Sequence, residues 1–96
     1  VLKIDAIAER IRTLGFPSEY RFTEYLKQSE IKEADKSDDG FNAVEDILKA
    51  FKILLSKQRE ILDLSDKMND EGTNTLMSDY IMEQEKSVWM YSAFLN

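Results

Sequence analysis

Residues 40–68 read GFNAVEDILKAFKILLSKQREILDLSDKM and form the longest helical segment that the sequence predicts. Its apolar residues recur every three or four positions, as the core-facing stripe of an amphipathic helix requires. They are Val44, Ile47, Leu48, Phe51, Leu54, Leu55, Ile61 and Leu62. Gln58 interrupts the stripe, and if it is buried it needs hydrogen-bond partners. The spacing predicts a long helix over residues 40–68.

The segments on either side are also predicted to be helical, because only three glycines and one proline punctuate the chain. Residues 1–14 form a helix that Gly15 and Pro17 end. Residues 15–39 are a connector that contains a short amphipathic helix. A last helix over residues 71–95 carries apolar residues on more than one face, which predicts burial on several sides and therefore assembly.

The amino end of the first predicted helix lacks a start signal. The helical pattern is already running at Val1, with no capping residue and no initiating methionine. We therefore expect an all-α bundle that is incomplete at its amino end, a truncated helix opening the chain. A processed or trimmed terminus is the alternative.

The composition excludes several classes of chemistry. The 96 residues contain no cysteine and no histidine, so disulfides, thiolate ligands, imidazole ligands and Ser-His-Asp catalysis are excluded within them. Any metal site must use carboxylates, which favour hard cations. The net charge of −6 argues against a nucleic-acid-binding surface. No apolar run is long enough to span a membrane, and we expect a cytoplasmic protein.

Asp5 and Glu9 are candidate metal ligands, because residues four apart share one face of a helix. The spacing alone is weak support. It recurs at Asp35/Asp39, Asp66/Asp70 and Asp79/Glu83. Such pairs are usually solvated, but Asp5 and Glu9 lie beside the apolar stripe of their helix rather than opposite it, where a neighbouring subunit could face them.

The acidic residues near the start of the last predicted helix have two interpretations. Asp70 and Glu71 would cap free N–H groups and complement the helix dipole, which is the favoured interpretation. Together with Asp79 they could also form a negative ring around a symmetry axis. Trp89, further along this helix, is expected to pack in the core.

Three stretches of the sequence resemble one known family. The opening IDAIAERIRTLGFP (residues 4–17), followed by EYLKQSEIKE (residues 24–33), resembles the second helix and connector of the Dps-type miniferritins. The end, NDEGTNTLMSDYIMEQEKSVWMYSAFLN (residues 69–96), is similar to the last helix of that family, including an E-K-x-x-W-M motif at residues 85–90. The resemblance covers essentially the whole chain.

The resemblance implies a ferritin-like four-helix bundle assembled into a hollow homo-dodecamer. Helix A and the start of helix B would be missing from this sequence, which would hold the end of the second helix (1–14), the connector, the third helix and the fourth. Such shells oxidise non-haem iron(II), preferably with hydrogen peroxide, at di-iron ferroxidase sites between two-fold-related subunits. The ferric mineral collects inside.

The resemblance also implies roles for individual residues. The ferroxidase carboxylates of the family match Asp5 and Glu9, while its histidines come from the first helix of the partner subunit. Iron would enter through three-fold pores lined by acids at the start of the last helix. Asp70, Glu71 and Asp79 are the candidates here. Thr75 stands where several members have an acid, and Trp89 is a hypothetical electron donor.

Two further expectations concern partners. DNA binding, from which the family takes its name, commonly depends on a lysine-rich tail, and the net charge of −6 opposes it. The alternative function is a non-enzymatic helical-bundle interaction module, in which Asp5 and Glu9 would be solvated surface residues.

Overall fold

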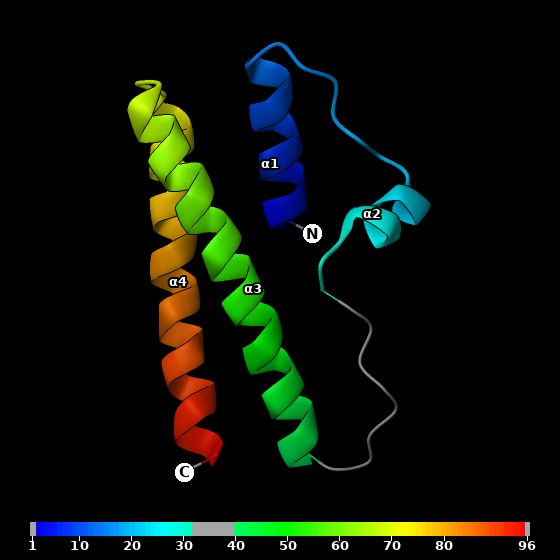
Figure 1. The fold of residues 1–96 in the computed structure, drawn as a ribbon, viewed down its shortest axis with the longest axis vertical. Helices are drawn as coiled ribbons and strands as arrows, with labels where there is room; N and C mark the ends of the chain where they lie inside the picture. Colours follow the sequence, from blue (N-terminus) through cyan, green and yellow to red (C-terminus); the bar gives the residue numbers. More distant parts are fainter. Residues whose placement is uncertain (1, 32–39, 96) are drawn as a thin grey trace. The chain divides into compact units, whose positions relative to one another are not determined.

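The computed structural model describes residues 2–31 and 40–95, and the only regular secondary structure in these residues is α-helix. The helices are α1 (Leu2–Thr13), α2 (Phe22–Gln28), α3 (Gly40–Lys67) and α4 (Glu71–Leu95), as Figure 1 shows. The all-α prediction is confirmed. No helix in these residues is both long and apolar enough to cross a lipid bilayer. Residues 32–39 of the predicted connector, including Asp35 and Asp39, lie outside the described residues.

The chain divides into two units, Val1–Glu30 and Ile31–Asn96. In the first unit, α1 ends in a left-handed turn. Gly15 has φ 95°, a conformation that costs glycine little. The Gly15 N–H donates to the Arg12 carbonyl at 2.9 Å, and the Phe16 N–H donates to the Ile11 carbonyl at 3.2 Å. This pair of bonds is a Schellman motif, so the helix ends where the sequence predicts it.

The segment before α2 is organised by the carboxylate of Glu19. One of its oxygens accepts hydrogen bonds from the backbone N–H groups of Tyr20 at 3.1 Å and Arg21 at 3.0 Å. The Arg21 guanidinium also donates to it, at 3.1 Å. These bonds lower the pKa of Glu19 to about 2, with the Arg21 side chain contributing most. The Tyr25 hydroxyl donates to the Glu19 carbonyl, which ties α2 to this turn.

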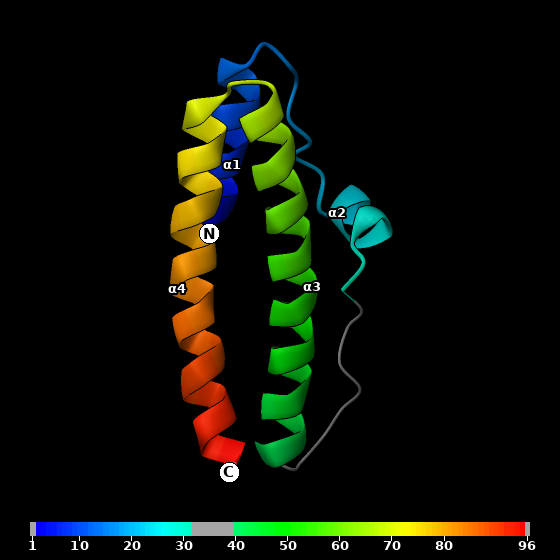
Figure 2. The ribbon, with the colours of Figure 1, turned by 60° about the vertical axis from the view of Figure 1, so that its left-hand side comes forward.

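The second unit is an antiparallel pair of helices, with α3 and α4 side by side in both views (Figures 1 and 2). The connection is short because Asp70 takes part in the hydrogen bonds of both helix ends. Asn69 adopts φ 57°, which ends α3. The Asp70 N–H donates to the Ser65 carbonyl at 2.8 Å, while the Asp70 carbonyl accepts the first helical hydrogen bond of α4, from Asn74, at 3.0 Å.

The two helices bury a single narrow seam. Its buried residues are Leu55, Met77 and Tyr80, which are apolar, and Gln58, Ser65 and Gln84, which are polar. The stripe predicted over residues 40–68 is wider than this seam: Ile47, Leu54 and Ile61 remain 38%, 37% and 41% exposed. The prediction that the whole stripe is core is therefore wrong for this unit, because one neighbouring helix covers only part of an apolar face.

Contacts along the seam fix how the helices face each other. The ring centroids of Phe51 and Tyr91 lie 6.1 Å apart, and those of Phe41 and Phe94 lie 5.5 Å apart. Nearer the turn, the Asn74 side chain donates to the Leu62 carbonyl at 3.2 Å and to the Ser65 hydroxyl at 3.4 Å. The seam is therefore aromatic towards the start of α3 and the end of α4, and partly polar towards the turn that joins the two helices.

Candidate metal site

The two predicted ligands, Asp5 and Glu9, both lie exposed on α1. They are four positions apart in the sequence and so occupy neighbouring turns on one side of the helix. No residue of α1 is fully buried, and Ile4 and Ile7 beside the pair are 56% and 39% exposed. The two carboxylates therefore lie on a helix whose neighbouring apolar side chains are still exposed to solvent.

Two carboxylates on one helix face can bind one hard divalent cation or bridge two. They leave most coordination positions of a transition metal open, so a complete site needs further ligands. Within residues 2–31 and 40–95, no group of three acidic side chains comes together as a metal-binding set. A metal bound by Asp5 and Glu9 would therefore need its remaining ligands from other residues or from solvent.

The three acids at the start of the last helix have different environments. Asp70 is the N-cap of α4: its carboxylate accepts a hydrogen bond from the Thr73 N–H at 3.2 Å and another from the Thr73 hydroxyl. Glu71, in the first turn, and Asp79, about two turns further on, are both exposed. The structural role predicted for Asp70 is thus visible, while Glu71 and Asp79 remain open to solvent in this chain.

Trp89 does not pack in the seam, contrary to the expectation that it lies in the core. Its side chain is 68% exposed. The reason is its position on α4: it is two residues from Tyr91, which faces α3 through its contact with Phe51. Two residues rotate a side chain by about 200°, to the opposite side of the helix.

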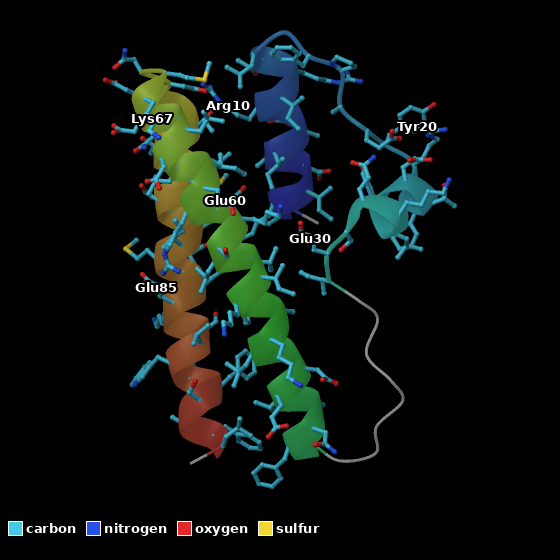
Figure 3. The ribbon with its side chains drawn as sticks, in the orientation of Figure 1. Arg10, Tyr20, Glu30, Glu60, Lys67 and Glu85 are labelled. Atoms are coloured by element: carbon cyan, nitrogen blue, oxygen red, sulfur yellow. The ribbon has the colours of Figure 1, made fainter. Side chains whose placement is uncertain are left out.

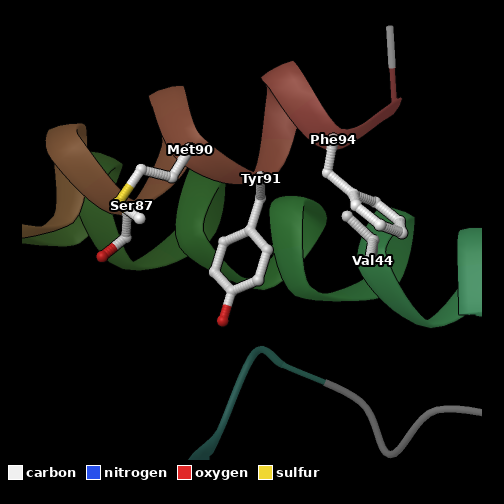
Figure 4. Close-up of a pocket in the computed structure, with 5 residues that line it drawn as sticks. All are labelled: Val44, Ser87, Met90, Tyr91 and Phe94. Carbon is white, nitrogen blue, oxygen red and sulfur yellow. The ribbon is translucent and has the colours of Figure 1, made fainter.

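A groove of about 480 Å³ opens near the ends of α3 and α4 (Figure 4). Its lining residues are Val44, Ser87, Met90, Tyr91 and Phe94. None of them is a carboxylate, so the lining lacks the ligands that a hard cation needs. The groove is apolar surface rather than a metal site.

The sequence did not predict the ion pair of one residue of α4 or the burial of another. Glu85 of the E-K-x-x-W-M motif, labelled on α4 in Figure 3, forms an ion pair with Arg59 of α3 at 3.1 Å. Gln84 is buried, although it is absent from the predicted core. Its spacing of seven from both Met77 and Tyr91 is the signal that could have identified it, because residues seven apart lie on one stripe.

Comparison with known proteins gives consistent results. A family profile described as a ferritin-like domain matches residues 3–96. An uncharacterized protein from Haemophilus influenzae is 46% identical over 93 residues, covering 97% of this chain. A DNA protection during starvation protein from Porphyromonas gingivalis is 39% identical over 92 residues, covering 96% of this chain. This chain spans 58% of the length of each of these relatives.

Solved structures agree with the sequence relatives. The Dps protein from Vibrio cholerae O1, described as a member of a broad superfamily of ferritin-like diiron-carboxylate proteins, superposes with a TM-score of 0.94 at 50% identity. The match covers 99% of this chain and 60% of that one. Dps from Listeria innocua superposes with a TM-score of 0.92 at 26% identity, covering 98% of this chain and 64% of that one. The chain belongs to the ferritin-like family and, within it, to the Dps-type miniferritins.

Proposed function

We propose that this protein oxidises iron(II) and stores the ferric product, and that Asp5 and Glu9 supply carboxylate ligands to the oxidation site. The observation that carries the proposal is the exposed pair of carboxylates on α1, in a chain of the ferritin-like family. A relative of known structure, the Vibrio cholerae Dps protein, is described as a ferritin-like diiron-carboxylate protein. Oxygen donors of this kind suit iron(II).

Asp5 and Glu9 would act by binding and by charge. On an exposed helix, like charges four residues apart repel by roughly 0.2–0.5 kcal/mol. A cation held between them removes that repulsion, and their negative charge favours iron as its positive charge rises on oxidation. Hydrogen peroxide is the proposed oxidant: each iron(II) gives up one electron, each peroxide takes up two electrons and two protons, and water is released.

The proposal requires more than one subunit. Two carboxylates do not complete the site, so we propose that a partner subunit supplies the remaining ligands at an interface within a homo-oligomeric shell of dodecameric type. The exposed Ile4 and Ile7 next to the pair are consistent with burial against another chain segment. Iron(II) would enter past Glu71 and Asp79, while Asp70 caps α4.

The same activity accounts for a protective role. Iron(II) and peroxide together generate damaging oxidants, so consuming both protects DNA without contact with it. The net charge of −6 opposes coating of DNA by this chain. We place this activity in the cytoplasm, where the DNA of a bacterial cell lies. A gel-shift assay at low salt tests this point: tight DNA binding by the intact protein would contradict protection by iron removal alone.

The test of the proposed ligands is a pair of charge-matched variants of the intact protein. Asp5→Asn combined with Glu9→Gln removes two negative charges from α1 and keeps the side-chain sizes. Glu60→Gln combined with Asp63→Asn makes the same change on exposed residues of α3. We expect the first variant to slow peroxide-dependent iron(II) oxidation at least tenfold, which is the range typical of lost metal-site interactions, and the second to leave the rate unchanged.

Shell assembly must be measured alongside the rate, by size-exclusion chromatography with light scattering. An assembled Asp5→Asn/Glu9→Gln variant with an unchanged oxidation rate would remove these residues from the site. That result would favour the alternative function, a helical module that acts through protein contacts.

A further inference from the structure

The start of α4 is joined to the end of α3 by side-chain hydrogen bonds as well as by the chain itself. The Asn74 amide nitrogen donates to the Leu62 carbonyl at 3.2 Å and to the Ser65 hydroxyl at 3.4 Å. The Ser65 hydroxyl in turn donates to the Leu62 carbonyl at 2.8 Å. We call this set of three residues, Leu62, Ser65 and Asn74, the Asn74 clamp.

The clamp is largely removed from solvent, and its hydrogen bonds are made within it. Ser65 is 4% exposed and Asn74 is half-buried. Because the Ser65 hydroxyl both accepts and donates a hydrogen bond, it avoids the cost of an unpaired buried polar group. Hydrogen bonds depend on direction, so a buried network of this kind holds its two helices in one orientation.

The clamp adds to what the turn between the helices already fixes. The backbone bonds of Asp70 determine where α3 ends and where α4 begins. Asn74 contacts α3 four residues later, one turn into α4. Rotation of α4 about its own axis would break both bonds of the Asn74 amide, so the clamp resists that rotation.

The rotation of α4 decides where two of its acids point. Glu71 and Asp79 are exposed, whereas Met77 lies in the seam and is 5% exposed. Residues eight apart on an α-helix differ in direction by only about 80° and lie about 12 Å apart along its axis. The rotation that the clamp holds is therefore one in which both carboxylates face solvent on the same side of α4.

We propose that Asn74 is a positioning residue for cation entry. By holding the first turns of α4 in one rotation, the clamp keeps Glu71 and Asp79 turned outwards together, so that a divalent cation meets one carboxylate and then the other. Carboxylates that face the same way concentrate their field and raise the local concentration of cations. The inference rests on the proposed entry of iron(II) past these two acids, and Asn74 itself acts without touching the ion.

The test is the dependence of the oxidation rate on iron(II) concentration in the intact protein. Asn74→Ala removes both bonds of the amide and should raise the iron(II) concentration at half-maximal rate by roughly 2–10-fold. The rate at saturating iron(II) should be unchanged, whereas Asp5→Asn/Glu9→Gln should lower it. Asn42→Ala, at an exposed asparagine of α3, is the matched control and should change neither value.

A double-mutant cycle distinguishes positioning from a general loss of stability. When Glu71→Gln and Asp79→Asn are already present, Asn74→Ala should not raise the half-maximal concentration further, because the carboxylates that the clamp positions are gone. A further rise in that background would overturn the proposal. So would an unchanged half-maximal concentration in Asn74→Ala alone.

Two other results have defined meanings. If Asn74→Ala does not assemble, Ser65→Ala removes one acceptor of the clamp and should give a smaller rise in the half-maximal concentration; no rise would overturn the proposal. A wild-type protein that does not oxidise iron(II) would refute the proposed function together with this inference, while normal oxidation that is insensitive to the clamp would refute the inference alone.

Discussion

Substitutions of Asp70 test whether this acidic residue caps helix α4 or serves the entry of ions. In this chain its carboxylate accepts the Thr73 N–H at 3.2 Å and the Thr73 hydroxyl, at the first turn of α4. Asp70→Ala removes both bonds and the negative charge at the helix N-terminus. Asp79 is also on α4 but is exposed, so Asp79→Ala changes the same charge without removing a cap.

The expected magnitude follows from these contacts. Loss of an N-cap costs about 0.5–2 kcal/mol, and loss of a charge that complements the helix dipole costs a further ~0.3–1 kcal/mol. The two losses together cost about 1–3 kcal/mol, which corresponds to a factor of roughly 5–150 in the local opening equilibrium. Asp70→Asn keeps an oxygen acceptor at the cap, so its effect should be limited to the smaller, dipole part.

Hydrogen exchange with mass spectrometry measures this locally, even in an assembled shell. Peptides that cover residues 71–77 should exchange about 5–150-fold faster in Asp70→Ala, whereas Asp79→Ala should leave them unchanged. Equal exchange in the two variants would refute the capping role. Slower iron uptake in Asp79→Ala, with normal exchange, would separate ion entry from helix stability.

Two further perturbations probe the turns that define the helix ends. Asn69 adopts φ 57°, so Asn69→Ala should destabilise the α3–α4 unit by about 1 kcal/mol while Asn69→Gly should not, which thermal unfolding of both variants would check. The pKa of Glu19 is lowered to about 2, so its ionised form stabilises the segment fully above the ordinary value of 4.5, and that contribution is lost as the pH falls through about 2. Arg21→Gln should raise the titration midpoint of the Glu19 carboxyl towards 4.5, and an unchanged midpoint in carboxyl NMR would show that the guanidinium does not hold it down.

The helices could be predicted from the sequence because periodicity and local chemistry set them. Gly15 ends α1 through a left-handed turn, which no other residue type adopts at so little cost. Asp70 is recognisable as a cap from its type and position. The turn at Asn69 is less obvious, because asparagine adopts the left-handed conformation less readily than glycine and its role depends on the hydrogen bonds on both sides.

The extent of burial could not be predicted from the sequence. A stripe in α3 shows which residues are apolar, but only the neighbouring helix decides which of them it covers, so Leu55 is buried while Ile61 is 41% exposed. Trp89 illustrates the same limit, since its burial depends on what packs against the side of α4 opposite α3. Side-chain type alone does not identify that neighbour.

Only part of the candidate metal site could be predicted from the sequence. The spacing of Asp5 and Glu9 places both carboxylates on one side of α1, and the structure shows them exposed there. The rest of a metal site cannot be read from these residues, because its ligands would come from a different chain segment. This chain spans 58% of the length of the relatives it matches, so a ligand outside that span leaves no signal in these residues.

Anomalous diffraction at the iron absorption edge would show whether Asp5 and Glu9 bind iron(II). Crystals of the intact protein would be loaded with iron(II) without oxidant, so that binding is observed before oxidation. We predict an anomalous peak in contact with carboxylate oxygens of both residues, and its loss in Asp5→Asn/Glu9→Gln. Ordered iron at Glu71 or Asp79 but none at Asp5 and Glu9 would contradict iron binding by this carboxylate pair.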